Sequence, residues 1–129
     1  MIGVDTNILV RFFVRDDEPQ FRKSLSILKE ESVFIPDTVL LETEWVLRYT
    51  YGFSPKEIHQ AFTDLLGLPK IHVTNPDLVL LSIECHQAGM DFSDAFHLAQ
   101  CGHCTRFLTF DRQLVNKAKR ISKCVVEKA

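Results

Sequence analysis

Blocks of hydrophobic and polar residues alternate along the chain and predict short strands separated by helices. Runs rich in apolar or β-branched residues predict strands at 1–4, 33–35 and 106–109, a weak edge strand at 71–73 and a possible last strand at 124–126. The segments between them carry apolar residues every three or four positions, as amphipathic helices do. Strands that alternate with helices imply a mostly parallel sheet covered on both faces, so the expected fold class is α/β.

Residues typical of helix ends mark several of the predicted helices. Ser54 and Glu57 have the spacing of a capping box, with Pro55 at the first helical position. Asp91 can cap a helix that contains Asp94 in its first turn and ends near Gly102. The remaining helices are expected at 8–14, after the polar cluster 16–19, from 36 to before residue 52, from 75 to 89 and around 113–119.

Composition changes this picture little. A chain of 129 residues, 46% hydrophobic and 25% charged, is an ordinary globular protein, and we expect one domain spanning 1–129. No apolar run approaches the roughly 20 residues of a membrane span, and no signal peptide is recognised, so a cytoplasmic location is expected. There is no internal repeat or linker.

Four cysteines, at 85, 101, 104 and 124, do not form the dense pattern of a secreted disulfide scaffold. Cys101 and Cys104 form a single C-x-x-C at a predicted helix C-terminus, where the helix dipole opposes a thiolate. We expect the four cysteines to act as small, buried hydrophobic side chains. Metal binding and redox chemistry are the alternatives.

Charge is distributed unevenly. Acids predominate up to residue 111, whereas the last 18 residues are basic and contain Arg112, Lys117, Lys119, Arg120, Lys123 and Lys128. This end of the chain is either a solvated helix or a patch that guides a polyanion toward an acidic site.

Two glutamates on the third predicted helix face different ways. At about 100° per residue from Val39, Glu44 falls near 140° and Arg48 near 180°, which predicts an ion pair on a wet face. Glu42 falls near 300°, within an arc of Trp45, Tyr49, Val39 and Val46, so we expect it inside an apolar face. A carboxylate there needs a hydrogen bond or a cation.

Three aspartates follow or precede predicted elements at one edge of the sheet. Asp5 follows the first strand, Asp111 follows the strand at 106–109, and Asp94 lies at a helix start. Each can be a helix cap by itself. A sheet ordered 3-2-1-4-5 brings them to one switch point, where several carboxylates stay ionised only around a cation. All-oxygen ligands favour Mg²⁺ or Mn²⁺ over zinc.

Four segments resemble a PIN domain, and more narrowly a VapC-type toxin of a toxin–antitoxin pair. They are MIGVDTNILVR at the N-terminus, LLETEWVL at 40–47, DFSDAFHLA at 91–99 and LTFD at 108–111. They follow the family's order and cover essentially the whole chain. The resemblance implies a three-layer α/β/α fold and a ribonuclease that depends on Mg²⁺ or Mn²⁺.

The resemblance also implies roles for individual residues. The catalytic, metal-binding acids match Asp5, Glu42, Asp94 and Asp111, whereas the supporting positions around them match Thr6, Asn7, Asp91 and Thr109. The C-x-x-C is not part of the family pattern. The mechanistic hypothesis is hydrolysis of an RNA phosphodiester by a metal-activated water, with Arg112 holding a flanking phosphate.

The expected partners follow from the same resemblance. The family usually forms homodimers and is inhibited by a VapB-type antitoxin, which Arg11 and Arg15 could anchor. A groove that receives an antitoxin segment is expected near six aromatic residues, although plain core packing also explains them: Phe12, Phe13, Phe21, Tyr49, Tyr51 and Phe53.

Two rival functions remain open. One is a phosphatase or phosphotransferase on a doubly wound sheet, but Asp5-Thr6-Asn7 lacks a second aspartate and no lysine lies at a strand exit. The other is a binding module for RNA or protein whose acids hold a structural ion.

Overall fold

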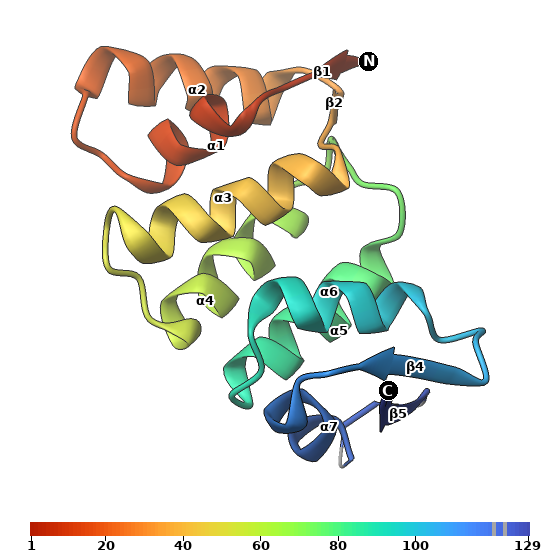
Figure 1. Cartoon of the computed structure of the whole chain (residues 1–129). Helices are drawn as coiled ribbons and strands as arrows, with labels where there is room; N and C mark the ends of the chain where they lie inside the picture. The colour runs from red at the N-terminus through yellow and green to blue at the C-terminus, as the bar shows by residue number, and fades with distance from the viewer. Residues whose placement is uncertain (120, 123) are drawn as a thin grey trace. The chain divides into compact units, whose positions relative to one another are not determined.

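The computed structural model describes residues 1–119, 121–122 and 124–129, and divides into two compact units, Met1–Pro76 and Asp77–Ala129. Each unit is described by itself. The elements are labelled in Figure 1.

The first unit contains a three-stranded parallel sheet. Its elements are β1 (Ile2–Gly3), α1 (Thr6–Phe13), α2 (Glu18–Glu30), β2 (Val33–Phe34), α3 (Asp37–Tyr49), α4 (Pro55–Leu66) and β3 (Ile71–His72). β2 is central and pairs with β1 on one side and β3 on the other. The predicted edge strand at 71–73 is therefore confirmed.

Helix caps in this unit follow from the sequence. Asp17 accepts a hydrogen bond from the backbone N–H of Gln20 at the start of α2, and Ser54 and Glu57 form the predicted capping box of α4. Gly52, before α4, has a φ of 69°, which a side chain would strain. The fully buried core of this unit is formed by Leu9, Leu28, Val33, Ile35, Leu40, Leu47, Ile58, Phe62 and Leu65.

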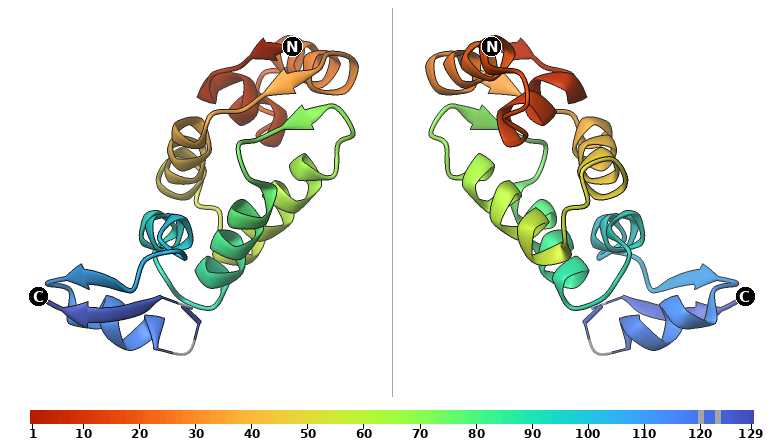
Figure 2. Two further views of the ribbon diagram at one scale, coloured as in Figure 1. Left: turned by 90° about the vertical axis from the view of Figure 1, so that its right-hand side faces the viewer. Right: turned by 90° about the vertical axis from the view of Figure 1, so that its left-hand side faces the viewer.

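The second unit contains α5 (Pro76–Gln87, which begins at the last residue of the first unit), α6 (Phe92–Gln100), β4 (Arg106–Thr109), α7 (Arg112–Ala118) and β5 (Val125–Lys128). β4 and β5 are parallel and in register from Arg106 opposite Val125 to Thr109 opposite Lys128. Figure 2 shows these two strands as neighbouring arrows with α7 beside them. β4 ends at Thr109, and Asp111, two residues later, is the N-cap of α7.

The observed elements confirm the α/β class, with parallel strands flanked by helices. The last strand was predicted at 124–126 and lies instead at Val125–Lys128, because Cys124 is buried in the core and the strand pairs along the whole of β4. Two expectations stay predictions. One is that the first strand pairs with the fourth, as the strand order 3-2-1-4-5 requires, and the other is that the chain forms a single domain. Of the predicted basic residues, Arg120 and Lys123 lie outside the described residues. None of the helices described here is long and apolar enough to cross a membrane.

Candidate active site

Asp5 lies between β1 and α1 and caps the helix. Its Oδ1 accepts hydrogen bonds from the backbone N–H groups of Asn7, at 3.1 Å, and Ile8, at 3.4 Å. The side chain is exposed. Both described hydrogen bonds use the same oxygen, and they fix the direction of the carboxylate at the carboxyl end of a parallel strand, where α/β folds bind ligands.

Thr6 links the first two predicted acids. Its side chain is buried in α1, and its hydroxyl donates a hydrogen bond to Oε1 of Glu42 on α3. α1 and α3 pack against each other. Glu42 is therefore held against the residue that follows Asp5, although the two positions are far apart in the sequence.

The predicted environment of the two α3 glutamates is wrong. Glu42 is exposed, whereas Glu44 has only 1% of its surface exposed and binds Arg48 through two hydrogen bonds of 2.8 and 3.1 Å. The ion pair is confirmed, but it is not on a wet face.

The prediction was wrong because it assigned the wrong face of α3 to the core. The side of the helix that packs into the core carries Leu40, Thr43, Glu44 and Leu47, while Trp45 and Tyr49 are exposed. The helical pattern predicts Trp45 and Tyr49 on the apolar face because both are large and aromatic. The leucines at 40 and 47, seven residues apart, were the signal for the correct face.

In the second unit two further acids, Asp91 and Asp111, lie near Asp94. Asp91 caps α6 by accepting the backbone N–H of Asp94 at 3.2 Å. Burial, and after it the charges of Asp91 and Asp111, raises the pKa of Asp94 above its ordinary value, against the opposing effects of His97 and Lys117. A carboxyl group with a raised pKa beside two other carboxylates is an environment that favours a cation.

Asp111 follows β4 and caps α7. Its Oδ1 accepts the N–H groups of Gln113, at 2.9 Å, and Leu114, at 3.2 Å. Its own N–H donates to the hydroxyl of Thr109 at 3.0 Å. Thr109 therefore supports the turn that positions Asp111.

Each unit thus brings two of the four predicted acids into one neighbourhood: Asp5 with Glu42 through Thr6, and Asp94 with Asp111. Within the described residues of either unit, no three His, Cys, Asp or Glu side chains are arranged to hold a metal ion. That all four acids form one site stays a prediction.

The three predicted arginines have different surroundings. Arg112 is exposed at the start of α7, directly after Asp111. Arg11 forms an ion pair with Asp16 and donates to the hydroxyl of Tyr51 at 3.4 Å. Arg15 pairs with Glu18 at 2.9 Å and lies 4.3 Å from the centre of the Phe21 ring.

The four cysteines are free thiols. Cys85 and Cys124 are buried, as predicted, whereas Cys101 and Cys104 are only partly buried. Burial, followed by the neighbouring thiol of Cys104, raises the pKa of Cys101, which disfavours the reactive thiolate. Cys85 has its pKa raised by burial and by Glu84.

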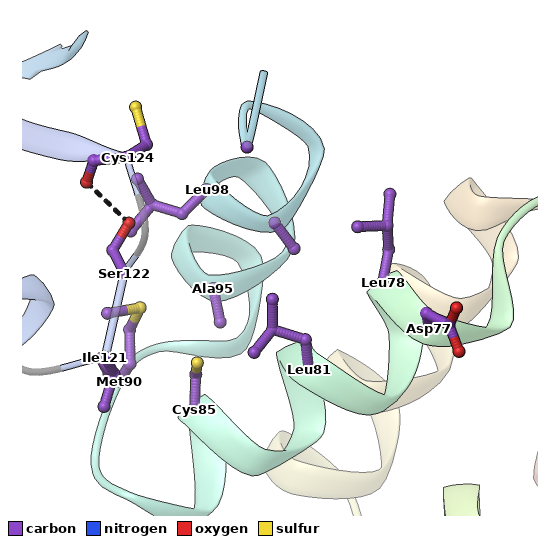
Figure 3. Close-up of a pocket in the computed structure, with 12 residues that line it drawn as sticks. Asp77, Leu78, Leu81, Cys85, Met90, Ala95, Leu98, Ile121, Ser122 and Cys124 are labelled. Carbon is purple, nitrogen blue, oxygen red and sulfur yellow. Dashed lines mark hydrogen bonds between the residues drawn. The ribbon is translucent and has the colours of Figure 1, made fainter. Parts of the chain in front are cut away.

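A cavity of about 410 Å³ lies inside the second unit (Figure 3). Its lining is mostly apolar and includes Leu81, Cys85, Met90, Leu98 and Cys124. None of the four predicted acids lines it. It therefore belongs to the core of the second unit rather than to the acidic site, and no sequence motif predicted it.

The comparison with protein-family models agrees with the motifs. A family model described as PIN domain matches residues 2–120. The search of curated proteins finds no match. Among solved structures, the chain is similar to one described as VapBC2 from Rickettsia felis bound to a DNA fragment from their promoter, with 20% identity, a TM-score of 0.34, and coverage of 99% of this chain and 98% of that one.

Proposed function

This chain belongs to the PIN domain family, whose members are generally nucleases, and we propose that it is a metal-dependent endoribonuclease and the toxin of a VapC-type toxin–antitoxin pair. The observation that carries the proposal is the environment of Asp94. Its carboxyl group is partly buried, and the neighbouring charges of Asp91 and Asp111 add to the raised pKa, so a bound cation would relieve the repulsion among these acids.

The donor chemistry fits Mg²⁺ or Mn²⁺. The candidate ligands Asp5, Glu42, Asp94 and Asp111 offer carboxylate oxygens alone, which are the ligands of these hard cations. When bound, the ion would supply a water of lowered pKa and charge neutralisation at the phosphate.

The remaining groups prepare the acids. Thr6 orients Glu42 by donating its hydroxyl hydrogen, and Thr109 supports the turn at Asp111. Helix N–H groups hold one oxygen of Asp5 and one of Asp111. Asn7 and Arg112 are exposed next to these acids, where Arg112 would bind a flanking phosphate of the RNA.

A VapB-type antitoxin is the proposed protein partner, together with a second copy of this chain. Arg11 and Arg15, the residues proposed to anchor the antitoxin, already pair with Asp16 and Glu18. An acidic antitoxin segment would therefore bind by exchanging these contacts rather than by meeting unpaired arginines.

The direct test uses a labelled single-stranded RNA incubated with the protein and Mn²⁺, with and without excess chelator. The proposal predicts internal cleavage that chelator abolishes. Cleavage that persists in chelator would exclude the metal, and intact RNA that nonetheless binds would favour a binding module.

A further inference from the structure

Two aromatic side chains form an exposed pair on α3. Trp45 and Tyr49 are 53% and 63% exposed, and their ring centres lie 4.9 Å apart at an angle of 44°. Large aromatic rings are costly to leave in water, and a contact between two of them keeps only part of that surface covered. A pair left this open is a candidate for contact with another molecule.

The guanidinium of Arg48 lies over the ring of Tyr49 and is itself held in place. The guanidinium carbon of Arg48 lies 4.5 Å from the centre of the Tyr49 ring, and the same guanidinium binds buried Glu44. Because Glu44 is anchored in the core, Arg48 and Tyr49 are ordered before any ligand arrives. Pre-ordered side chains lose less conformational entropy on binding.

Trp45 and Tyr49 lie on the same face of α3 as Glu42. Residues three and seven positions apart on an α-helix share a face, so Glu42, Trp45 and Tyr49 form one ridge. All three side chains are exposed. A strand of nucleic acid with its phosphodiester at Glu42 would therefore pass over the two rings.

We propose that Trp45 and Tyr49 are a stacking platform for unpaired bases of the RNA substrate, next to the acid Glu42. The inference rests on the proposed ribonuclease function and names the substrate as single-stranded RNA. Exposed aromatic faces with a neighbouring arginine are the means by which proteins bind unpaired bases with little sequence preference. Bases inside a duplex cannot reach such a platform.

RNA explains this ridge better than a second copy of the chain does. Interface cores are depleted of charged residues, and a symmetric contact centred here would bring two Glu42 carboxylates toward each other. The ridge also carries exposed Thr38, so it is not a continuous apolar face.

The test follows the fluorescence of Trp45, the chain's single tryptophan, in excess chelator so that no cleavage occurs. We expect saturable quenching by a 12-nucleotide single-stranded RNA and none by the same RNA annealed to its complement. Tyr49→Ala should weaken binding about 5- to 150-fold, the effect of losing one stacked base, and Tyr49→Phe should restore it. Leu80→Ala, an exposed apolar residue on α5, is the control that should bind normally.

Three results would overturn the platform. They are cleavage of RNA without quenching, equal quenching by duplex RNA, or a fluorescence change that follows protein concentration in the absence of RNA, which would mark a self-association surface. Selective quenching by a protein that never cleaves RNA would support the platform and reject the proposed nuclease, so the two failures are distinguishable.

Discussion

Glu42 in the first unit and Asp94 in the second have opposite surroundings. In the first unit Glu42 accepts a hydroxyl hydrogen from Thr6, so a neutral donor stabilises the carboxylate. In the second unit Asp94 lies beside two further carboxylates and part of it is buried, so its ionised form is destabilised.

This difference separates two contributions to a metal site. A hydrogen-bonded acid is oriented before the cation arrives, whereas crowded acids make the cation's arrival favourable by relieving repulsion. In the proposed site, the acids of the first unit would contribute a fixed geometry and Asp94 of the second would contribute the repulsion that a cation relieves. Substitutions in the two units should fail differently.

The largest expected effect comes from removing one charge from either unit. Asp5→Asn and Asp94→Asn should each reduce cleavage by more than about 100-fold, exceeding the loss typical of a supporting residue. Asparagine can still cap α1 in place of Asp5, so the circular dichroism spectrum should not change. Cleavage by both variants at the normal rate would remove these acids from the mechanism.

Thr6→Val should have a smaller effect, a loss of about 10–100-fold in cleavage. The substitution keeps the buried volume of Thr6 but removes the hydrogen bond that orients Glu42. Raising the Mn²⁺ concentration should recover part of the activity, because Glu42 itself remains. Thr6→Ser, which keeps the hydroxyl, is the control, and equal activity of the valine and serine variants would contradict the role.

A matched pair on α3 distinguishes a structural acid from a functional one. Glu44→Gln should lower the free energy of unfolding by about 1–3 kcal/mol, because it removes the charge of a buried acid that binds Arg48. Glu42→Gln should change it by less than about 0.5 kcal/mol but abolish cleavage. Urea unfolding with a parallel cleavage assay tests both, and the opposite ranking of stabilities would contradict the assigned faces.

The smallest effect concerns pH. The folded protein raises the pKa of Asp94, so it binds this proton more tightly than the unfolded chain does, and stability falls as pH rises from the ordinary value of 3.8 through the raised one. In chelator, Asp94→Asn should therefore equal wild type below this range and have a slightly higher Tm at neutral pH. Adding Mn²⁺ should stabilise wild type more than the variant, and an unchanged Tm difference with Mn²⁺ would place the ion elsewhere.

Most element positions could be predicted because they depend on local signals. The capping box at Ser54, the cap at Asp91 and the strand at 106–109 each follow from a few neighbouring residues. The end of the chain was harder. Val125–Lys128 becomes a strand because it pairs with β4, and pairing over this sequence distance is not visible in local composition.

The α3 error shows what residue type cannot decide. Hydrophobicity alone assigned Trp45 and Tyr49 to the core and Glu44 to water, but Glu44 is buried because Arg48, one turn away, compensates its charge. A buried acid that has a cationic partner and an exposed pair of aromatic rings are both compatible with a stable fold. A hydropathy pattern predicts neither of them. The predicted meeting of acids from distant segments depends on tertiary structure, so the sequence indicated it only through the expected strand order 3-2-1-4-5 and the family motifs.

Asp5 and Asp111 each cap a helix, and both are also proposed catalytic acids. A relative of this protein that loses these carboxylates would therefore fold best with asparagine in their place. Asparagine caps a helix as well as aspartate does, whereas alanine does not. Asparagine at these two positions would mark a relative that has lost catalysis while remaining under selection for its shape.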